Sequence, residues 1–292
     1  MTARLDVEVA GGQLATFRLG AERAEAPLVL AIHGITSSSR TWLATARALG
    51  DRAALIAVDL RGRADSHALP APFGLAAHVR DMVAVLDRFG LGRALVVGHS
   101  LGAYVAARLA GDHPDRVSGV VLVDGGLTIP ESTGVDPEAF MTAFLGPTLE
   151  RLRMTFPDLE AYRAWWGRHP ALVGADIDPA DLAEYAAHDL VGEAPELRSS
   201  VNPQVVRDDG VDLFHAVDAN ALNVPAVLLC APRGMVDDPN PMQPLELVQA
   251  WAASDPGRRR AVEVADVNHY TIALGRRGAE AVASEIVRAL ET

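Results

Sequence analysis

The stretch Val96–Gly102 constrains the fold more than any other part of this sequence. It reads Val-Val-Gly-His-Ser-Leu-Gly, so an apolar run leads into Gly-x-Ser-x-Gly and then into an alanine-rich helical pattern. A serine between a strand and a helix occupies a sharp turn, and the flanking glycines let neighbouring backbone pass close to it. The free N–H groups of the new helix favour negative charge at the same place. The pattern therefore predicts that Ser100 is a nucleophile at the carboxyl end of a buried strand.

Continuous apolar runs elsewhere predict strands that are covered on both faces. They alternate with patterns of helical period, and this alternation favours a parallel sheet with helices on both sides. Two short alternating runs near the N-terminus, separated by Gly11-Gly12, predict a hairpin. The expected strands are 28–32, 54–58, 94–97, 119–123, 226–230 and 261–264, and the expected helices include 42–49, 76–89 and 279–290.

The alternation stops between residues 127 and 222, where prolines and short helical patterns replace it. We expect an α/β fold with a mostly parallel, doubly wound sheet, formed by residues 1–126 and 223–292, and a helical cap inserted at 127–222. Most of the aromatic and methionine side chains of the cap are expected to pack it onto the core, and some to line a pocket: Phe140, Met141, Phe144, Met154, Phe156 and Tyr162.

Composition excludes several classes of function. The formal net charge is −12, whereas a nucleic-acid-binding protein needs a basic face. The single cysteine, Cys230, allows no intrachain disulfide and lies in an apolar run. No signal-peptide pattern and no apolar run of membrane-spanning length occurs, so we expect a cytoplasmic protein without a membrane partner. Zinc-ligand spacings and phosphate-binding glycine loops are also absent from the sequence, so neither a metal nor a cofactor is expected.

A serine hydroxyl becomes a good nucleophile only when an oriented base takes its proton. In a parallel sheet that base and its partner acid should follow other strands at their carboxyl ends. His269 follows the last expected strand and is the favoured base. Asp237, in the loop after the fifth expected strand, is the favoured acid. Asp124 at the end of the fourth strand is the serious alternative, and Asp238 is a weaker one.

The reaction also needs two backbone donors for the oxyanion. The N–H of Leu101, directly after the serine, is one candidate. The N–H of Ile35 is the second, because Gly34 permits a close approach there. His33 is expected to support the backbone of this tight turn, and His99 is expected to point away from the nucleophile.

The order serine, aspartate, histidine, together with His-Gly at 33–34 and Gly-His-Ser-Leu-Gly at 98–102, resembles the α/β-hydrolase fold superfamily. Residues 59–66 are similar to its Asp-x-Arg-Gly-x-Gly-x-Ser loop, and the insertion lies where this superfamily carries a cap. The resemblance covers nearly the whole chain apart from that insertion. Asn268 stands where glycine is usual before the histidine. A serine in the elbow sets the chain apart from branches that use an aspartate nucleophile.

The resemblance implies a serine hydrolase that cleaves carboxylic esters through an acyl-enzyme. An apolar cap favours a hydrophobic small-molecule substrate. The same site could serve lactones, thioesters, amides, carbon–carbon bonds or acyl transfer, and the fold also hosts slow-turnover small-molecule receptors. The sequence leaves these alternatives, and the oligomeric state, open.

Overall fold

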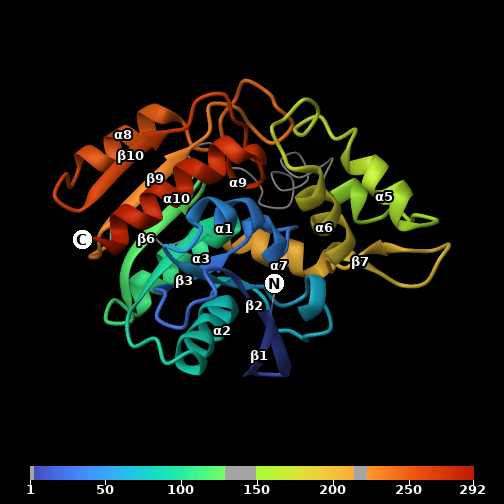
Figure 1. The fold of residues 1–292 in the computed structure, drawn as a ribbon, viewed down its shortest axis with the longest axis horizontal. Helices are drawn as coiled ribbons and strands as arrows, with labels where there is room; N and C mark the ends of the chain where they lie inside the picture. The colour runs from blue at the N-terminus through green and yellow to red at the C-terminus, as the bar shows by residue number, and fades with distance from the viewer. Residues whose placement is uncertain (1–2, 129–148, 214–221) are drawn as a thin grey trace.

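An eight-stranded sheet organises the molecule (Figure 1), seen in a computed structural model that describes residues 3–128, 149–213 and 222–292. The strand order is β1-β2-β4-β3-β5-β6-β9-β10. The strands are β1 (Ala3–Val9), β2 (Gly12–Gly20), β3 (Leu28–Ile32), β4 (Ala54–Val58), β5 (Ala94–His99), β6 (Val117–Val123), β9 (Ala226–Cys230) and β10 (Arg259–Glu263).

The sheet is parallel from β4 to β10, as the continuous apolar runs predict, and β1 and β2 form an antiparallel hairpin at one edge. Three expected strands agree with the structure at both ends: β3, β4 and β9. β6 starts two residues before its expected position, and β10 spans 259–263 where the sequence favoured 261–264. The predicted α/β class with a mostly parallel, doubly wound sheet is confirmed.

Helices cover both faces of the sheet. On one face α1 (Leu43–Leu49) packs against α10 (Arg276–Leu290), and their apolar side chains meet those of β3 and β5. The other face carries α2 (Leu75–Arg88), α3 (Leu101–Asp112) and α8 (Leu245–Ala253). There α3 packs on β5 and β6, α2 packs on α3, and α8 packs on β9 and β10. Because every central strand is covered on both sides, its loops at the carboxyl end are held on a rigid platform.

The chain between β6 and β9 forms α5 (Leu159–Trp166), α6 (Pro179–Asp189), the short antiparallel pair β7 (Leu190–Val191) and β8 (Arg198–Ser199), and α7 (Pro203–Leu213). In Figure 1, α5 and α6 lie beside the sheet, on the side away from α8 and β10. They pack in an apolar cluster that also includes Leu274 of the core, whereas α7 packs against α2 and α3. The division into a core and a cap at 127 and 222 stays a prediction, because residues 129–148 and 214–221 lie outside the described part.

Candidate active site

Ser100 occupies the turn between β5 and α3 in a strained conformation. Its φ of 53° and ψ of −121° are rare for a residue with a side chain. A Cβ atom placed on Gly98 would lie 2.1 Å from the carbonyl oxygen of Gly102, and one on Gly102 would lie 2.1 Å from that of Ile32. No residue other than glycine fits either position without moving the backbone. The glycines of the motif thus allow the turn that lifts the serine out of the sheet.

His269 meets a carboxylate that follows a different strand. Its ring Nδ1–H donates to Asp124 Oδ2 at 2.7 Å, and both side chains are buried. Asp124 comes directly after β6, the neighbour of β5 in the sheet. Its positive φ of 46° and the hydrogen bond from Ala231 N–H to Asp124 Oδ1, at 3.0 Å, fix the carboxylate in place. Ser100, Asp124 and His269 therefore follow the carboxyl ends of β5, β6 and β10, and the imidazole contacts the aspartate.

Asp237, the acid that the sequence favoured, lies elsewhere, and this expectation is contradicted by the geometry. Its side chain is about a third exposed, and it forms an ion pair with Arg233 four residues earlier. Its Oδ1 also accepts a hydrogen bond from Asn268 Nδ2 at 3.0 Å. The alternative weighed from the sequence, Asp124, is the one that contacts His269. Asp238 binds the backbone of its own loop, through the N–H of Asn240.

Asn268 fixes the loop that carries His269. Its Oδ1 accepts hydrogen bonds from the N–H groups of Tyr270 and Thr271, at 3.0 and 2.9 Å, at the start of α9 (Thr271–Leu274). Its Nδ2 donates at 2.8 Å to the carbonyl of Ala171 in the insertion. The sequence marked this residue only as a replacement of the usual glycine. Here the side chain ties the histidine loop to the segment that precedes α6.

His33 orients the peptide that is expected to bind the oxyanion. Its Nδ1–H donates to the carbonyl of Gly34 at 2.7 Å, and its Nε2 accepts the N–H of Leu60 at 3.0 Å. These two bonds require the neutral tautomer, and burial lowers the pKa of His33 to about 3. Since the Gly34 carbonyl points at this ring, the N–H of Ile35 in the same planar peptide points the opposite way. This matches the backbone role that the sequence predicted for His33.

Two buried arginines hold the next two carbonyls of this loop. Arg63 Nε donates to Ile35 O at 2.9 Å, and the same guanidinium pairs with Asp209 of α7. Arg151 Nη2 donates to Thr36 O at 2.9 Å, and its other Nη pairs with Asp189 at the end of α6. All three carbonyls of residues 34–36 are thus fixed. The sequence carries no local signal for Arg63 or Arg151, because their partners are distant along the chain.

The two expected oxyanion donors have no acceptor among the described residues. Leu101 is the first residue of α3, so its N–H lies before the first intrahelical bond. Ile35 lies in the loop after β3, and its N–H makes no hydrogen bond within the described part of the chain. Both residues adjoin Ser100: Ile35 lines the same pocket, and Leu101 follows it in sequence. Free donors in this position suit an oxygen that becomes negative during attack.

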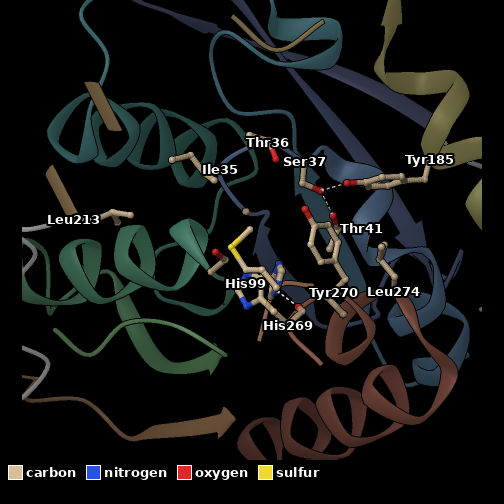
Figure 2. Close-up of a pocket in the computed structure, with 14 residues that line it drawn as sticks. Ile35, Thr36, Ser37, Thr41, His99, Tyr185, Leu213, His269, Tyr270 and Leu274 are labelled. Carbon is tan, nitrogen blue, oxygen red and sulfur yellow. Dashed lines mark hydrogen bonds between the residues drawn. The ribbon is translucent and has the colours of Figure 1, made fainter. Parts of the chain in front are cut away.

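His99 departs from the expectation that it points away from the nucleophile. Its ring lies against that of His269, with centroids 4.8 Å apart, and its Nε2–H donates to the His269 carbonyl at 2.9 Å. Burial, with the nearby His269, lowers the pKa of His99 well below its usual value. The neutral ring therefore supports the backbone of His269 from below. Figure 2 shows the two imidazoles together at the floor of the pocket.

The pocket above these rings has one apolar and one hydroxyl-bearing wall. In Figure 2, Leu213 and Ile35 lie on one side, and Ser37, Thr41 and Tyr185 on the other. From the insertion, Tyr185 and Leu213 reach the pocket. Of the side chains that the sequence put forward, Met154, Phe156 and Tyr162 pack in an apolar cluster that the insertion shares with Leu274 of α9. Phe140, Met141 and Phe144 lie outside the described residues.

A cluster of side chains with cation-ligating atoms lies outside this pocket. Asp59, Asp65 and His188 bring ligand atoms within 4.8 Å of one another. Protein groups already use these atoms, since His188 Nε2 contacts Asp59 at 2.8 Å and Arg4 pairs with Asp65 at 2.9 Å. These contacts give the cluster a structural explanation.

In the ranges that the structure describes, no helix combines the length and the apolar character needed to cross a bilayer.

Comparisons with known proteins agree with this architecture. A family model described as alpha/beta hydrolase fold matches residues 27–162. The solved structure of E-2-(acetamidomethylene)succinate hydrolase superposes with a TM-score of 0.77 at 20% identity, and the match covers all of both chains. At that identity the likeness concerns the fold alone.

Curated relatives match over shorter stretches. Lipase LipV of Mycobacterium tuberculosis is 34% identical over 153 residues, which are 51% of this chain and 56% of the lipase. RutD of Klebsiella pneumoniae, named as a candidate carbamate hydrolase, is 35% identical over 109 residues. Those residues are 37% of this chain and 41% of RutD. The chain thus spans about half, or less, of the length of these relatives.

Proposed function

From the α/β-hydrolase fold of the chain, whose family model matches residues 27–162, we propose that this protein is a serine hydrolase of carboxylic esters. The observation that carries the proposal is that Ser100, in its strained turn, lines one pocket with His269, whose ring is bonded to the buried Asp124. A hydroxyl, an imidazole and a carboxylate in this order form the machinery of acyl transfer on many folds.

In the proposed reaction, Ser100 Oγ attacks the acyl carbon while His269 takes its proton through Nε2. Asp124 keeps the Nδ1 proton in place and stabilises the imidazolium that forms. The N–H groups of Leu101 and Ile35 bind the oxyanion. His269 then protonates the leaving alcohol, and a water molecule, activated by the same ring, hydrolyses the acyl-enzyme.

Serine-specific labelling tests the proposal. A fluorophosphonate should react with the protein, and peptide mapping should place the adduct on Ser100. Ser100→Ala should abolish labelling and lower kcat for ester hydrolysis at least a thousandfold while folding persists. Ser118→Ala, at an exposed position of β6, is the matched control and should change neither. Full activity in Ser100→Ala would remove this mechanism.

The leaving group is a separate question, because the same residues act on lactones, thioesters, amides and carbamates. The relatives named above include a lipase and a candidate carbamate hydrolase. A panel with one common acyl group and different leaving groups should show the largest kcat/KM for esters. A preference for another bond of more than about tenfold would reassign the substrate class and leave the serine mechanism intact.

A further inference from the structure

Three hydroxyl groups form a chain on one wall of the pocket, remote in sequence from the motif that carries the chemistry. Tyr185 on α6 donates to Ser37 Oγ at 3.1 Å, and Ser37 Oγ is bonded to Thr41 Oγ1. Tyr185 and Thr41 are buried, and Ser37 is partly exposed to the pocket. Figure 2 shows the three side chains converging on the oxygen of Ser37.

The three linked hydroxyl groups carry one more hydrogen than their hydrogen bonds to one another use. Three hydroxyls carry three hydrogens, and the two bonds between them use two. With Tyr185 as donor to Ser37, the remaining hydrogen lies on Thr41 or on Ser37, whichever way their shared bond runs. No further acceptor for it is found among the described residues. A hydroxyl hydrogen that lies beside the pocket and has no protein acceptor favours a ligand oxygen at this position.

The charge around the pocket limits what that ligand is. None of the described lining residues is an aspartate, glutamate, arginine or lysine. The segments 129–148 and 214–221 also contain no arginine or lysine in their sequence. A substrate carboxylate would therefore be desolvated without a cationic partner, which is strongly unfavourable.

We infer that the substrate is an uncharged ester with an oxygen acceptor, an ether, carbonyl or hydroxyl oxygen, in the arm that meets Ser37 and Thr41. Its other arm is apolar and lies against Leu213 and Ile35. This inference rests on the proposed ester hydrolysis at Ser100 and adds the substrate class.

Matched ester pairs test the inference, since either arm of the ester could carry the oxygen. Phenyl 4-methoxybutanoate and phenyl hexanoate differ by one oxygen in the acyl arm. The butanoates of 2-methoxyethanol and of 1-butanol differ in the same way in the alcohol arm. In one of the two pairs, the ether should have a kcat/KM about fivefold higher than its alkyl partner, as one neutral hydrogen bond provides. Monophenyl glutarate, which carries a carboxylate, should be at least about tenfold poorer than phenyl 4-methoxybutanoate.

Substitutions in the three hydroxyl-bearing residues test whether their hydroxyls cause the preference for the ether. The triple change of Ser37→Ala, Thr41→Val and Tyr185→Phe removes all three hydroxyls, and the ratio of the preferred ether to its alkyl partner should fall to about one. Thr41→Ser keeps every hydroxyl and should keep the ratio. Tyr185→Phe should also keep it, because the remaining pair of hydroxyls still has one hydrogen to spare. Circular dichroism and thermal melting check that each variant is folded.

The outcomes separate this inference from the function on which it rests. Turnover of the phenyl esters by the wild-type protein without an ether preference in either arm, or with the glutarate monoester preferred, would overturn the inference alone. Loss of the ratio in Tyr185→Phe would contradict the hydrogen count. Failure of every ester to turn over, together with no fluorophosphonate adduct on Ser100, would instead overturn the proposed function.

Discussion

Replacement of Asp124 by asparagine should disable the enzyme while the fold stays intact. Asp124 Oδ1 accepts the Ala231 N–H at 3.0 Å, and an asparagine keeps this bond by placing its amide oxygen there. Its NH₂ group then faces His269 Nδ1, at the position where Oδ2 now accepts a proton. The imidazole must turn its lone pair toward this NH₂ and carry its proton on Nε2. A ring in that tautomer cannot take the proton of Ser100.

The expected loss of activity follows from this change of the His269 tautomer. The wrong tautomer, together with the loss of the charge that stabilises the imidazolium, should lower kcat about 10⁴-fold. That factor corresponds to about 5.4 kcal/mol of lost transition-state stabilisation. Stopped-flow measurement of the acylation step with an aryl ester isolates it from deacylation, and urea unfolding verifies that stability is retained.

Asp237→Asn is the matched control. This carboxylate is partly exposed and pairs with Arg233, and an asparagine can still accept the hydrogen bond from Asn268. Partly exposed pairs of this kind contribute little, so kcat should stay within about twofold of wild type. The opposite ranking, with Asp237→Asn inactive and Asp124→Asn active, would refute the assignment of the acid.

Two further predictions concern stability and the oxyanion loop. Burial lowers the pKa of His33 to about 3 and that of His169 to about 4, and the pKa of His99 is also well below its usual value, so the unfolded chain binds protons that the folded chain does not. The free energy of unfolding should therefore fall as the pH drops from about 6.5 toward 4, by up to about 1.4 kcal/mol per pH unit for each histidine. Urea titrations of His169→Gln should show that the free energy of unfolding depends on pH about one third less steeply at pH 5. An unchanged slope would contradict this origin. Arg151→Lys keeps the charge but cannot hold both Asp189 and the Thr36 carbonyl. It should therefore cost about 3 kcal/mol of stability and lower kcat about tenfold with little change in KM. A folded variant with wild-type kcat would show that the loop needs no such support.

Local sequence predicts most of the fold because its signals are short-range. The apolar runs of β3, β4 and β9 coincide with the strands, and the Gly-x-Ser-x-Gly turn appears where the motif places it. Each of these features is decided by neighbours within a few residues. The histidine at 269 could be selected for the same reason, since it follows the last strand.

The carboxylate that contacts His269 could not be selected in this way. Asp124 and Asp237 both follow a strand, so position along the chain does not distinguish them. The choice depends on which carboxylate faces His269 after folding. It also depends on contacts such as the ion pair of Arg233 with Asp237, which engages the other carboxylate elsewhere. Asn268 and Arg151 escaped prediction because their partners lie about 100 residues away.

The fixed carbonyls of residues 34–36 have a consequence for engineering. One of the groups that hold them, Arg151, comes from the insertion, and another, Arg63, is itself anchored by Asp209 of α7. A chimaera that exchanges this insertion for that of another hydrolase would change the substrate chamber and also untether the backbone that we propose receives the developing charge. Grafts that carry over an equivalent guanidinium should therefore keep their turnover, whereas grafts chosen for chamber shape alone should bind and react slowly.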